Sequence, residues 1–473
     1  MNILTILLGV LPATLIGWLL VRVVEGRTPV LLQIERIALG FVLGLTLTMF
    51  TAFVLNITGL IAFAAVGFAI ADAVLLIPLI AILAWRRQPS LFRSAVPPPS
   101  PPLPPWVKGL AVILGIWIVA KIAAGAFILL ATPAYFDDVY NNWNMRGKLF
   151  FETEALTLEI PAGNEGESAG GVSSYPPTVP MVKAMLSTIP GEWREGVVSG
   201  VHILWYIAIL VLLYGSLRRR SNTAVALLGT YIFASLPLPL VHGSTAYADI
   251  FLAAHLLPAV AFLFHALSSD SVEECLTHMR LSALCTALLV FTKNEALVLH
   301  LPPLLLLVLI SILWLRKQNA LTGKQALTAL AWYVVSIAMI AIPWIAFKFA
   351  HGLPFGNAKS ISGLSIAWQE GVAYAIWINT FFEGNWNLLP PLLILLLIAL
   401  RKEAFRTPLV ILSAFFLIVY LGQMPLYFFT GISTEALKQT GYARGLVQLM
   451  PIAVLLTTLL LHEKAGKWTV SSG

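Results

Sequence analysis

Long apolar runs alternate with short polar segments along almost the whole chain. Windows of about 20 apolar residues, the length of helix that crosses the hydrocarbon core of a bilayer, recur about thirteen times. The predicted spans lie near residues 3–21, 37–56, 60–85, 107–131, 197–217, 222–241, 247–267, 281–293, 295–315, 327–349, 387–400, 407–429 and 445–461. The pattern predicts an all-α fold, a polytopic transmembrane helical bundle with one large polar loop at 132–196.

Composition agrees with this prediction and narrows the function classes. Of the 473 residues, 59% are hydrophobic and only 11% are charged, which is outside the range of soluble globular domains. The net charge of +7 does not indicate nucleic-acid binding, because the basic residues cluster in short loops between apolar runs. Cys275 and Cys285 are too few for a disulfide framework, and we expect both to be reduced packing residues.

The distribution of Lys and Arg predicts the orientation. When the loops are placed alternately, 19 of the 29 basic residues fall on one side, which is therefore predicted to be cytoplasmic. The first apolar run is predicted to be an uncleaved span. The amino terminus then lies outside and the carboxyl terminus lies inside. We expect a multi-pass protein of the cytoplasmic (inner) membrane whose unusual polar residues face the exterior, in loops 132–196, 242–246, 350–386 and 430–444 and in the turn near 293–295.

A proline-rich segment at 86–106 divides the chain. Its prolines favour an extended spacer. We expect an accessory amino-terminal transmembrane unit at 1–106 that ends in this cytoplasmic linker. A main transmembrane body follows at 107–461, and a cytoplasmic tail at 462–473.

The polar loop opens with the strongest candidate for chemistry. A carboxylate at a membrane surface can act as a general base, and its neighbour can orient it or bind a metal. The alternative is that these acids only meet the positive end of a helix dipole. That alternative does not explain the polar and aromatic residues around the acids, so we favour a functional role. The candidates are Asp137 and Asp138 with Tyr135, Asn142, Trp143 and Arg146.

Four shorter motifs place further polar residues at the predicted outer face. An acid at the mouth of an apolar span is costly unless it faces a cavity or a cation, and a planar guanidinium suits phosphate. Structural ion pairs and interfacial anchors are the alternatives. The motif residues are Tyr175 in SYPP, Tyr247 and Asp249 in the hairpin after His242, Lys293 and Glu295 in TKNE, and Arg444 before Gln448. Lys348 belongs to an outer segment whose spacing is not diagnostic, and His255 is predicted to be a hydrogen-bonded packing residue.

Two charges fall inside predicted spans. Asp72 and Lys121 lie at similar depths in consecutive antiparallel spans. We expect a buried ion pair between them, outside the site.

Taken in order, these motifs resemble the GT-C superfamily of membrane glycosyltransferases, and within it the branch of protein mannosyltransferases and aminoarabinose transferases. The resemblance covers residues 107–461, while 1–106 have no counterpart. It implies an integral-membrane enzyme that moves a sugar from a polyprenyl-phosphate donor, with inversion, to an extracytoplasmic protein, lipid or glycan acceptor.

The resemblance also implies residue roles. Asp137 or Asp138 would be the general base, and Asp249 a second acid that orients the acceptor or shares a cation. Lys293, Arg444 and Arg146 would bind the donor phosphate. Substrate contacts would come from Tyr135, Asn142, Trp143, Tyr175, Tyr247 and Glu295. No cofactor is implied with certainty, and a divalent cation stays open because no metal-ligand spacing is present.

Two other readings compete with this one. A secondary transporter or lipid flippase would be expected to show internal repeats and midplane binding residues, but the sequence shows no repeat and the charges assigned to the site lie at the outer mouth of the spans. A lipid-linked glycan polymerase or ligase would be expected to rely on arginines and a histidine more than on acids.

Overall fold

The fold is entirely helical over the residues that the structure, a computed structural model, describes: 2–86, 91–96, 99, 102–158, 173–355 and 366–471. Two of the helices, η1 and η2, are short π-helical segments. In chain order the helices are α1 (Asn2–Glu25), α2 (Gln33–Ile57), α3 (Ala65–Trp85), α4 (Pro105–Ala131), η1 (Val139–Asn144), α5 (Met145–Thr153), α7 (Thr178–Thr188), α8 (Glu195–Gly200), α9 (His202–Arg220), α10 (Thr223–Ala234), α11 (Pro237–Gly243), α12 (Ala248–Ala266), α13 (Val272–Leu289), η2 (Ala296–His300), α14 (Leu301–Lys317), α15 (Gly323–Ala350), α16 (Val372–Phe381), α17 (Leu389–Ala399), α18 (Arg401–Ala404), α19 (Val410–Phe429), α20 (Ser433–Leu437) and α21 (Gly441–Ser471).

Every predicted span falls on a helix, but fewer helices are able to cross a membrane than the sequence predicts. Among the described residues, ten helical segments are long and apolar enough, and α10 with α11 makes an eleventh if this bent pair is one span. The two are inclined by 74° where Pro237 begins α11, since proline cannot continue a helix. Charges in its first half keep α13 below the apolar threshold, and the 11 residues of α17 reach only about 16 Å.

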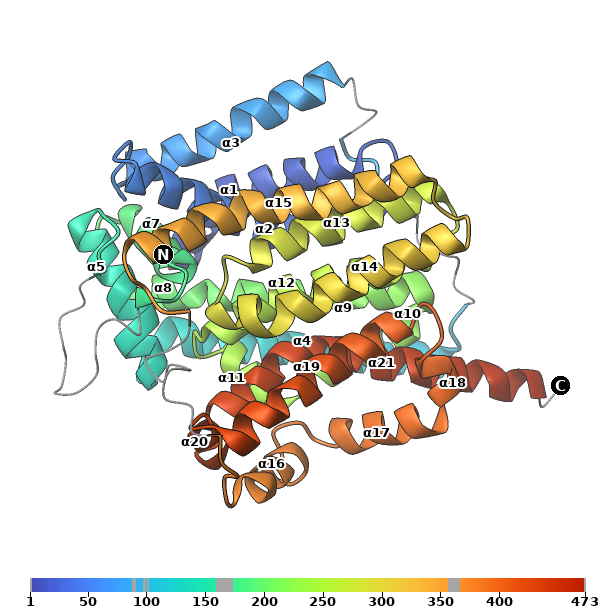
Figure 1. The fold of residues 1–473 in the computed structure, drawn as a ribbon. Coiled ribbons are helices and arrows are strands. Elements are labelled where there is room, and N and C mark those ends of the chain that lie inside the picture. The colour runs from blue at the N-terminus through green and yellow to red at the C-terminus, as the bar shows by residue number, and fades with distance from the viewer. Residues whose placement is uncertain are drawn as a thin grey trace.

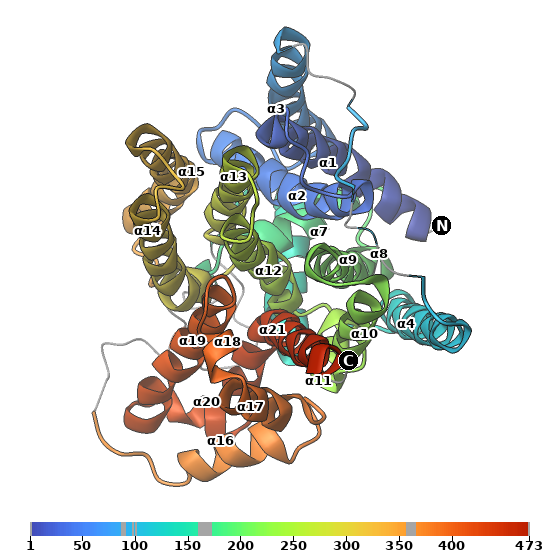
Figure 2. The same cartoon turned by 90° about the vertical axis from the view of Figure 1, so that its right-hand side faces the viewer.

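The spans form a bundle around α12. Figure 1 shows the long helices running side by side, with α5, α7 and α8 near the amino terminus at one end of the bundle and the carboxyl terminus at the other. Viewed along the bundle in Figure 2, α12 lies at the centre, and its apolar window is 100% buried. The window of α4 on the periphery is only 17% buried, as expected for a helix that faces lipid.

The amino-terminal helices pack closely on each other and on the main body. Glycines let α1 and α2 touch along their backbones: a Cβ on Gly17 would lie 1.9 Å from the Gly40 carbonyl oxygen, and one on Gly44 would lie 1.9 Å from that of Ala13. Small residues allow such close approach where hydrophobicity alone cannot drive association in lipid. On its other side α2 packs against α9.

The predicted Asp72–Lys121 ion pair is wrong. Asp72 on α3 accepts a hydrogen bond of 3.0 Å from Thr48 Oγ1 on α2, and Lys121 Nζ lies 5.0 Å above the ring of Trp117 on its own helix. Figure 2 shows α3 and α4 on different sides of the bundle. Depth along consecutive spans could not reveal this, because consecutive spans need not be neighbours.

Two smaller predictions are confirmed. His255 Nε2 lies 2.8 Å from Thr46 Oγ1 and its Nδ1 lies 2.9 Å from the Phe251 carbonyl oxygen, so its ring ties α12 to α2. Cys275 and Cys285 are buried free thiols in α13.

Candidate functional site

A buried polar cluster lies at the amino-terminal end of α12, and we name this end of the bundle the outer end. Asp249, in the first turn of α12, is 1% exposed. Its Oδ1 accepts hydrogen bonds of 2.8 Å from Lys293 Nζ and 2.8 Å from Gln448 Nε2, and its Oδ2 lies 3.5 Å from His242 Nδ1. The positive end of the α12 dipole also favours the carboxylate. We call Asp249, His242, Lys293, Glu295, His300 and Gln448 the outer cluster.

Lys293 joins two carboxylates in this cluster. Its Nζ lies 3.2 Å from Glu295 Oε1 in addition to its contact with Asp249, and 5.8 Å from the centre of the Tyr175 ring. Burial alone lowers the pKa of the Lys293 ammonium, but Asp249 and Glu295 outweigh burial and hold that pKa above its usual value. Lys293 is therefore a fixed cation, and Glu295 Oε2 is buried with no hydrogen-bond partner among the described residues.

A second ion pair joins the first outer loop to α21. Arg444 Nη1 contacts Asp138 Oδ2, and Asn141 Nδ2 donates to Asp137 Oδ1. Asp138 remains 40% exposed at its side chain, so it is open to a ligand from the outer surface.

The Asp138–Arg444 pair lies close to the outer cluster. Arg444 and Gln448 are four residues apart on α21, which places them on the same face one turn apart, and Gln448 in turn contacts Asp249. Phe136 and Tyr247 also make ring contact at 5.5 Å, so the loop before η1 touches the α11–α12 turn. The sequence motifs from three distant parts of the chain therefore meet at one place.

A pair of cations, with no carboxylate partner among the described residues, lies beneath the SYPP segment. Arg146 on α5 is 1% exposed and donates from Nη2 to the Tyr175 carbonyl oxygen at 3.1 Å, while its Nε and Nη1 have no hydrogen-bond partner in the described parts of the chain. Lys348 Nζ on α15 donates to the adjacent Ser174 carbonyl oxygen at 2.5 Å and to Asn294 Oδ1 at 3.2 Å. Burial lowers the pKa of the Arg146 guanidinium to about 9. The guanidinium still carries its charge at neutral pH, and an anion bound here would raise its pKa back toward the usual value.

The predicted substrate residues are distributed around these groups. Tyr175 contacts Trp143 edge-on at 5.6 Å and lies under Lys293, and Tyr247 stacks on His242 at 4.5 Å. Burial raises the pKa of the Tyr175 hydroxyl well above its usual value, so the hydroxyl keeps its proton and can donate a hydrogen bond.

Tyr135 and Asn142 differ in their access to solvent. Tyr135 is 77% exposed and packs on Phe136, so it lies at the rim of the site. Asn142 is buried, and its Oδ1 has no hydrogen-bond partner within the described ranges.

Sequence reasoning did not assign four residues of this region to the site: His242, which only marked the start of a motif, and Gln448, His300 and Lys348. Gln448 was only quoted beside Arg444, although a four-residue spacing on a helix would have placed it on the same face. His300, whose Nε2 lies 2.8 Å from Gln448 Oε1, carried no signal because it lies inside an apolar run. Lys348 was one of several outer-segment charges, and its role depends on the packing of α15.

The acids do not gather into a recognisable metal site. Within the described residues, no group of three His, Cys, Asp or Glu side chains is placed to hold a metal ion. Asp249 and Glu295, with Lys293 between them, are held by a cation of the protein itself.

Comparisons with known proteins agree on the fold. No family model matches the chain, and no curated protein matches it. Two solved structures do: ArnT from Cupriavidus metallidurans in the apo state, with a TM-score of 0.52, and the same protein bound to undecaprenyl phosphate, with a TM-score of 0.51. Each match has 15% sequence identity and covers 77% of this chain and 63% of the ArnT chain. This chain therefore shares the helical membrane fold of ArnT, as its resemblance to the GT-C superfamily predicted.

Proposed function

We propose that this protein is a membrane glycosyltransferase that moves a sugar from a polyprenyl-phosphate donor to an acceptor outside the cytoplasm. The observation that carries the proposal is the outer cluster together with the Asp138–Arg444 pair, at one end of an ArnT-like bundle. One of the two ArnT structures holds undecaprenyl phosphate, a polyprenyl phosphate without its sugar. The orientation predicted from Lys and Arg puts this end outside the cytoplasm.

The reaction requires one bond to form and one to break at the anomeric carbon of the sugar. The acceptor heteroatom attacks that carbon, the carbon–oxygen bond to phosphate breaks, and the configuration inverts. A general base removes the acceptor proton. Asp137 and Asp138 are the candidates, since both stand at the open side of the site; Asp249, enclosed by Lys293 and Gln448, would orient the acceptor or fix the cations.

The leaving group is the polyprenyl phosphate, which gains negative charge as the bond breaks. Cations held in place before the reaction stabilise such charge without reorganising. Lys293, Arg444 and Arg146 would fulfil this role. Lys348 would join them, because it donates to the Ser174 carbonyl oxygen and Arg146 donates to that of the next residue, Tyr175. Arg146 has donors that no described residue uses, whereas Lys293 and Arg444 each have a carboxylate partner that a phosphate would have to share.

The substrate contacts would surround this line of charges. Tyr135, at the rim, and Tyr247, which is half-buried, offer faces on which a sugar ring or an isoprenoid can pack, and the buried Trp143 and Tyr175 would support the site behind them. Asn142 Oδ1 and Glu295 Oε2, both buried acceptors with no hydrogen-bond partner in the described residues, would accept from sugar hydroxyls.

The test is transfer of a radiolabelled sugar from a panel of polyprenyl-phosphate sugars, in membranes that contain the protein or an empty vector. The proposal predicts that with at least one donor the label leaves the lipid fraction, enters an acceptor fraction and leaves free polyprenyl phosphate. Label that crosses the membrane while still on its carrier would support a flippase instead. Growth of a lipid-linked glycan by whole repeat units would support a polymerase or ligase.

A further inference from the structure

A second polar cavity lies at the opposite end of the bundle from the outer cluster. Asp249 and His265 are 16 residues apart on α12, which corresponds to about 24 Å along the helix. The cavity at the His265 end has a volume of about 340 Å³, which is within the range of small-molecule sites. Its walls include the last turn of α9, the last turn of α12 and the first turns of α13. We call it the inner cavity.

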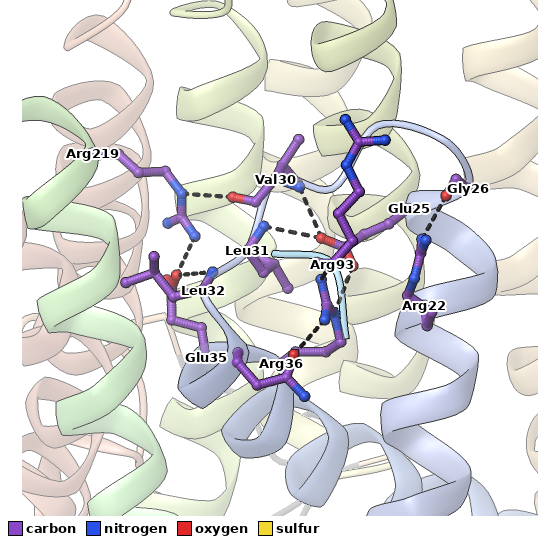
Figure 3. Close-up of polar contacts among 11 residues, drawn as sticks. Arg22, Glu25, Gly26, Val30, Leu31, Leu32, Glu35, Arg36, Arg93 and Arg219 are labelled. Atoms are coloured by element: carbon purple, nitrogen blue, oxygen red, sulfur yellow. Dashed lines mark hydrogen bonds and ion pairs between the residues drawn. The ribbon is translucent and has the colours of Figure 1, made fainter. Parts of the chain in front are cut away.

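One wall of the inner cavity is a loop between α1 and α2 that a buried charge holds rigid (Figure 3). Glu25 Oε1 accepts hydrogen bonds from the backbone amides of Val30 and Leu31 at 2.8 and 2.9 Å, and its Oε2 accepts from Arg36 Nε at 2.7 Å. Arg36 Nη2 donates to the carbonyl oxygen of Arg93 at 2.9 Å, which fixes the segment after α3 to the same loop. The wall is therefore formed before any ligand arrives.

The same loop positions an arginine of α9. Arg219 donates from Nη2 to Glu35 Oε2 at 2.6 Å and from Nε to the Val30 carbonyl oxygen at 3.0 Å (Figure 3). Its third nitrogen, Nη1, is buried and has no hydrogen-bond partner among the described residues. We call the contacts of Glu25, Glu35, Arg36, Arg93 and Arg219 the inner network. Within the described residues, the network therefore leaves the Nη1 amino group of Arg219 available to a ligand.

Three consecutive arginines line the inner cavity. Arg218 and Arg220 flank Arg219 at the end of α9, and each donates to a backbone carbonyl oxygen: Arg218 to Ser221 at 3.2 Å and Arg220 to Ser268 at 3.4 Å. A guanidinium has five donors, and Arg220 uses one of them in a contact that the structure records. Arginine forks suit the oxygens of a phosphate group.

Two histidines add buried nitrogens to the wall. His265 and His278 are 2% and 1% exposed, and their ring centres are 5.6 Å apart. The Nε2 atom of each is buried with no hydrogen-bond partner in the described part of the chain, although His278 Nδ1 is 3.1 Å from Ser269 Oγ. Buried polar atoms without partners are rare in folded proteins, and a ligand or water in the cavity would satisfy these two.

The charges around the cavity favour an anion inside it. Asp270 and Glu274 also line it, against three arginines; Asp270 is exposed and therefore solvated, and Glu274 is half-buried. Arg218 is only 7% exposed, so its charge acts at lower effective dielectric. Because they line the cavity, the Asp270 and Glu274 carboxylates could pair with an amine of the bound ligand.

We propose that the inner cavity binds a phosphate ester, through the arginines at the end of α9 and the two histidines. Its source is either the head group of a phospholipid in the adjacent leaflet or a soluble phosphate compound. This site is separate from the outer cluster, and the proposal does not depend on the glycosyltransferase assignment.

The experiment measures binding to the purified full chain in detergent. Native mass spectrometry counts the phosphatidylglycerol and phosphatidylethanolamine molecules that remain bound, and equilibrium dialysis measures radiolabelled inorganic phosphate. The variants are Arg220→Gln and the pair Arg218→Gln with Arg220→Gln. Arg401→Gln is the matched control, because Arg401 is an exposed arginine at the same end of the bundle but outside the cavity.

The proposal predicts one bound phosphate compound, lipid or inorganic, whose affinity falls about tenfold in Arg220→Gln and further in the double variant, with no change in Arg401→Gln. Retained phospholipid identifies the lipid source, and saturable inorganic phosphate identifies the soluble one. Equal binding by wild type and both cavity variants, or no binding of either probe, overturns the proposal. Should the double variant lose its thermal transition, Arg220→Gln and Arg220→Lys decide.

Discussion

The outer cluster and the inner network both bury an ion pair, yet they use its charges differently. The side chains of Glu25 and Arg36 are 0% exposed, and those of Lys293 and Asp249 at the outer end are 4% and 2% exposed. Glu25 accepts from two backbone amides of its own loop with Oε1 and from the Arg36 side chain with Oε2, whereas the partners of Asp249 among the described residues are side chains from other segments.

The hydrogen-bond partners of a buried carboxylate therefore distinguish a structural role from a functional one. A carboxylate that satisfies backbone amides holds a loop in place, and its loss is a loss of fold. A carboxylate that contacts only side chains orients those side chains for function. Nearby atoms that lack a hydrogen-bond partner in the described residues, such as Glu295 Oε2, are then available to a substrate. Substitutions at the outer end should therefore affect activity, and substitutions in the inner network should affect stability.

The largest expected effect is on the pair between Asp138 and Arg444. Exchanging the two charges, with Asp138→Arg and Arg444→Asp in one protein, keeps an ion pair but moves the carboxylate away from the loop. We expect sugar transfer to fall about 10³-fold while the thermal transition in detergent stays close to wild type. Recovery of transfer in the exchanged protein, relative to either single variant, would mean that the pair is only structural.

The next effect is on the inner network. Glu25→Gln leaves Arg36 buried without its counter-charge, and we expect the free energy of unfolding to fall by about 3–5 kcal/mol. Transfer per folded molecule should not change. Equilibrium unfolding in mixed micelles measures the first quantity. Glu152→Gln is the control, because Glu152 belongs to an exposed pair with Lys148 and should cost less than about 0.5 kcal/mol.

A smaller effect is expected at Arg146. Arg146→Gln removes the buried cation that has spare donors, and we expect KM for the lipid donor to rise about 10- to 100-fold. Lys148→Gln is the matched control, since Lys148 lies two residues away with its side chain 53% exposed. An unchanged KM together with a lower thermal transition would assign Arg146 to the fold instead.

The smallest effect is expected at Lys121. Lys121 packs on Trp117 of its own helix and has no carboxylate partner among the described residues. Lys121→Leu should change the free energy of unfolding by less than about 0.5 kcal/mol. A loss of several kcal/mol would restore the ion pair with Asp72 that the sequence predicts and the structure lacks.

The sequence predicts much of the fold because a bilayer imposes a strict length and composition on each span. Each of the thirteen predicted segments is a helix, and the errors come from α13, α17 and the bent pair α10–α11, where charge, length or proline interrupts the pattern. Neighbour relations were harder to predict. The prediction of an Asp72–Lys121 ion pair was wrong because a hydropathy pattern does not indicate which spans are in contact.

For the site, the sequence identified charged residues in the right loops but not their partners. The contacts Asp249–Lys293 and Asp138–Arg444 join segments 44 and 306 residues apart. His300 could not be identified, since a histidine inside an apolar run is equally consistent with packing. The unmatched donors of Arg146 became visible only after α5, α15 and the SYPP segment were placed together.

The most direct test of the account is sugar transfer by Asp137→Asn, Asp138→Asn and Asp249→Asn, each at matched expression with wild type, from a polyprenyl-phosphate sugar that wild type uses. The account predicts that one variant of the first pair abolishes transfer, that Asp249→Asn reduces it strongly, and that the folded fraction of the inactive base variant stays that of wild type. If all three variants transfer sugar as wild type does, the outer acids are not the catalytic groups and the assignment of this site is wrong.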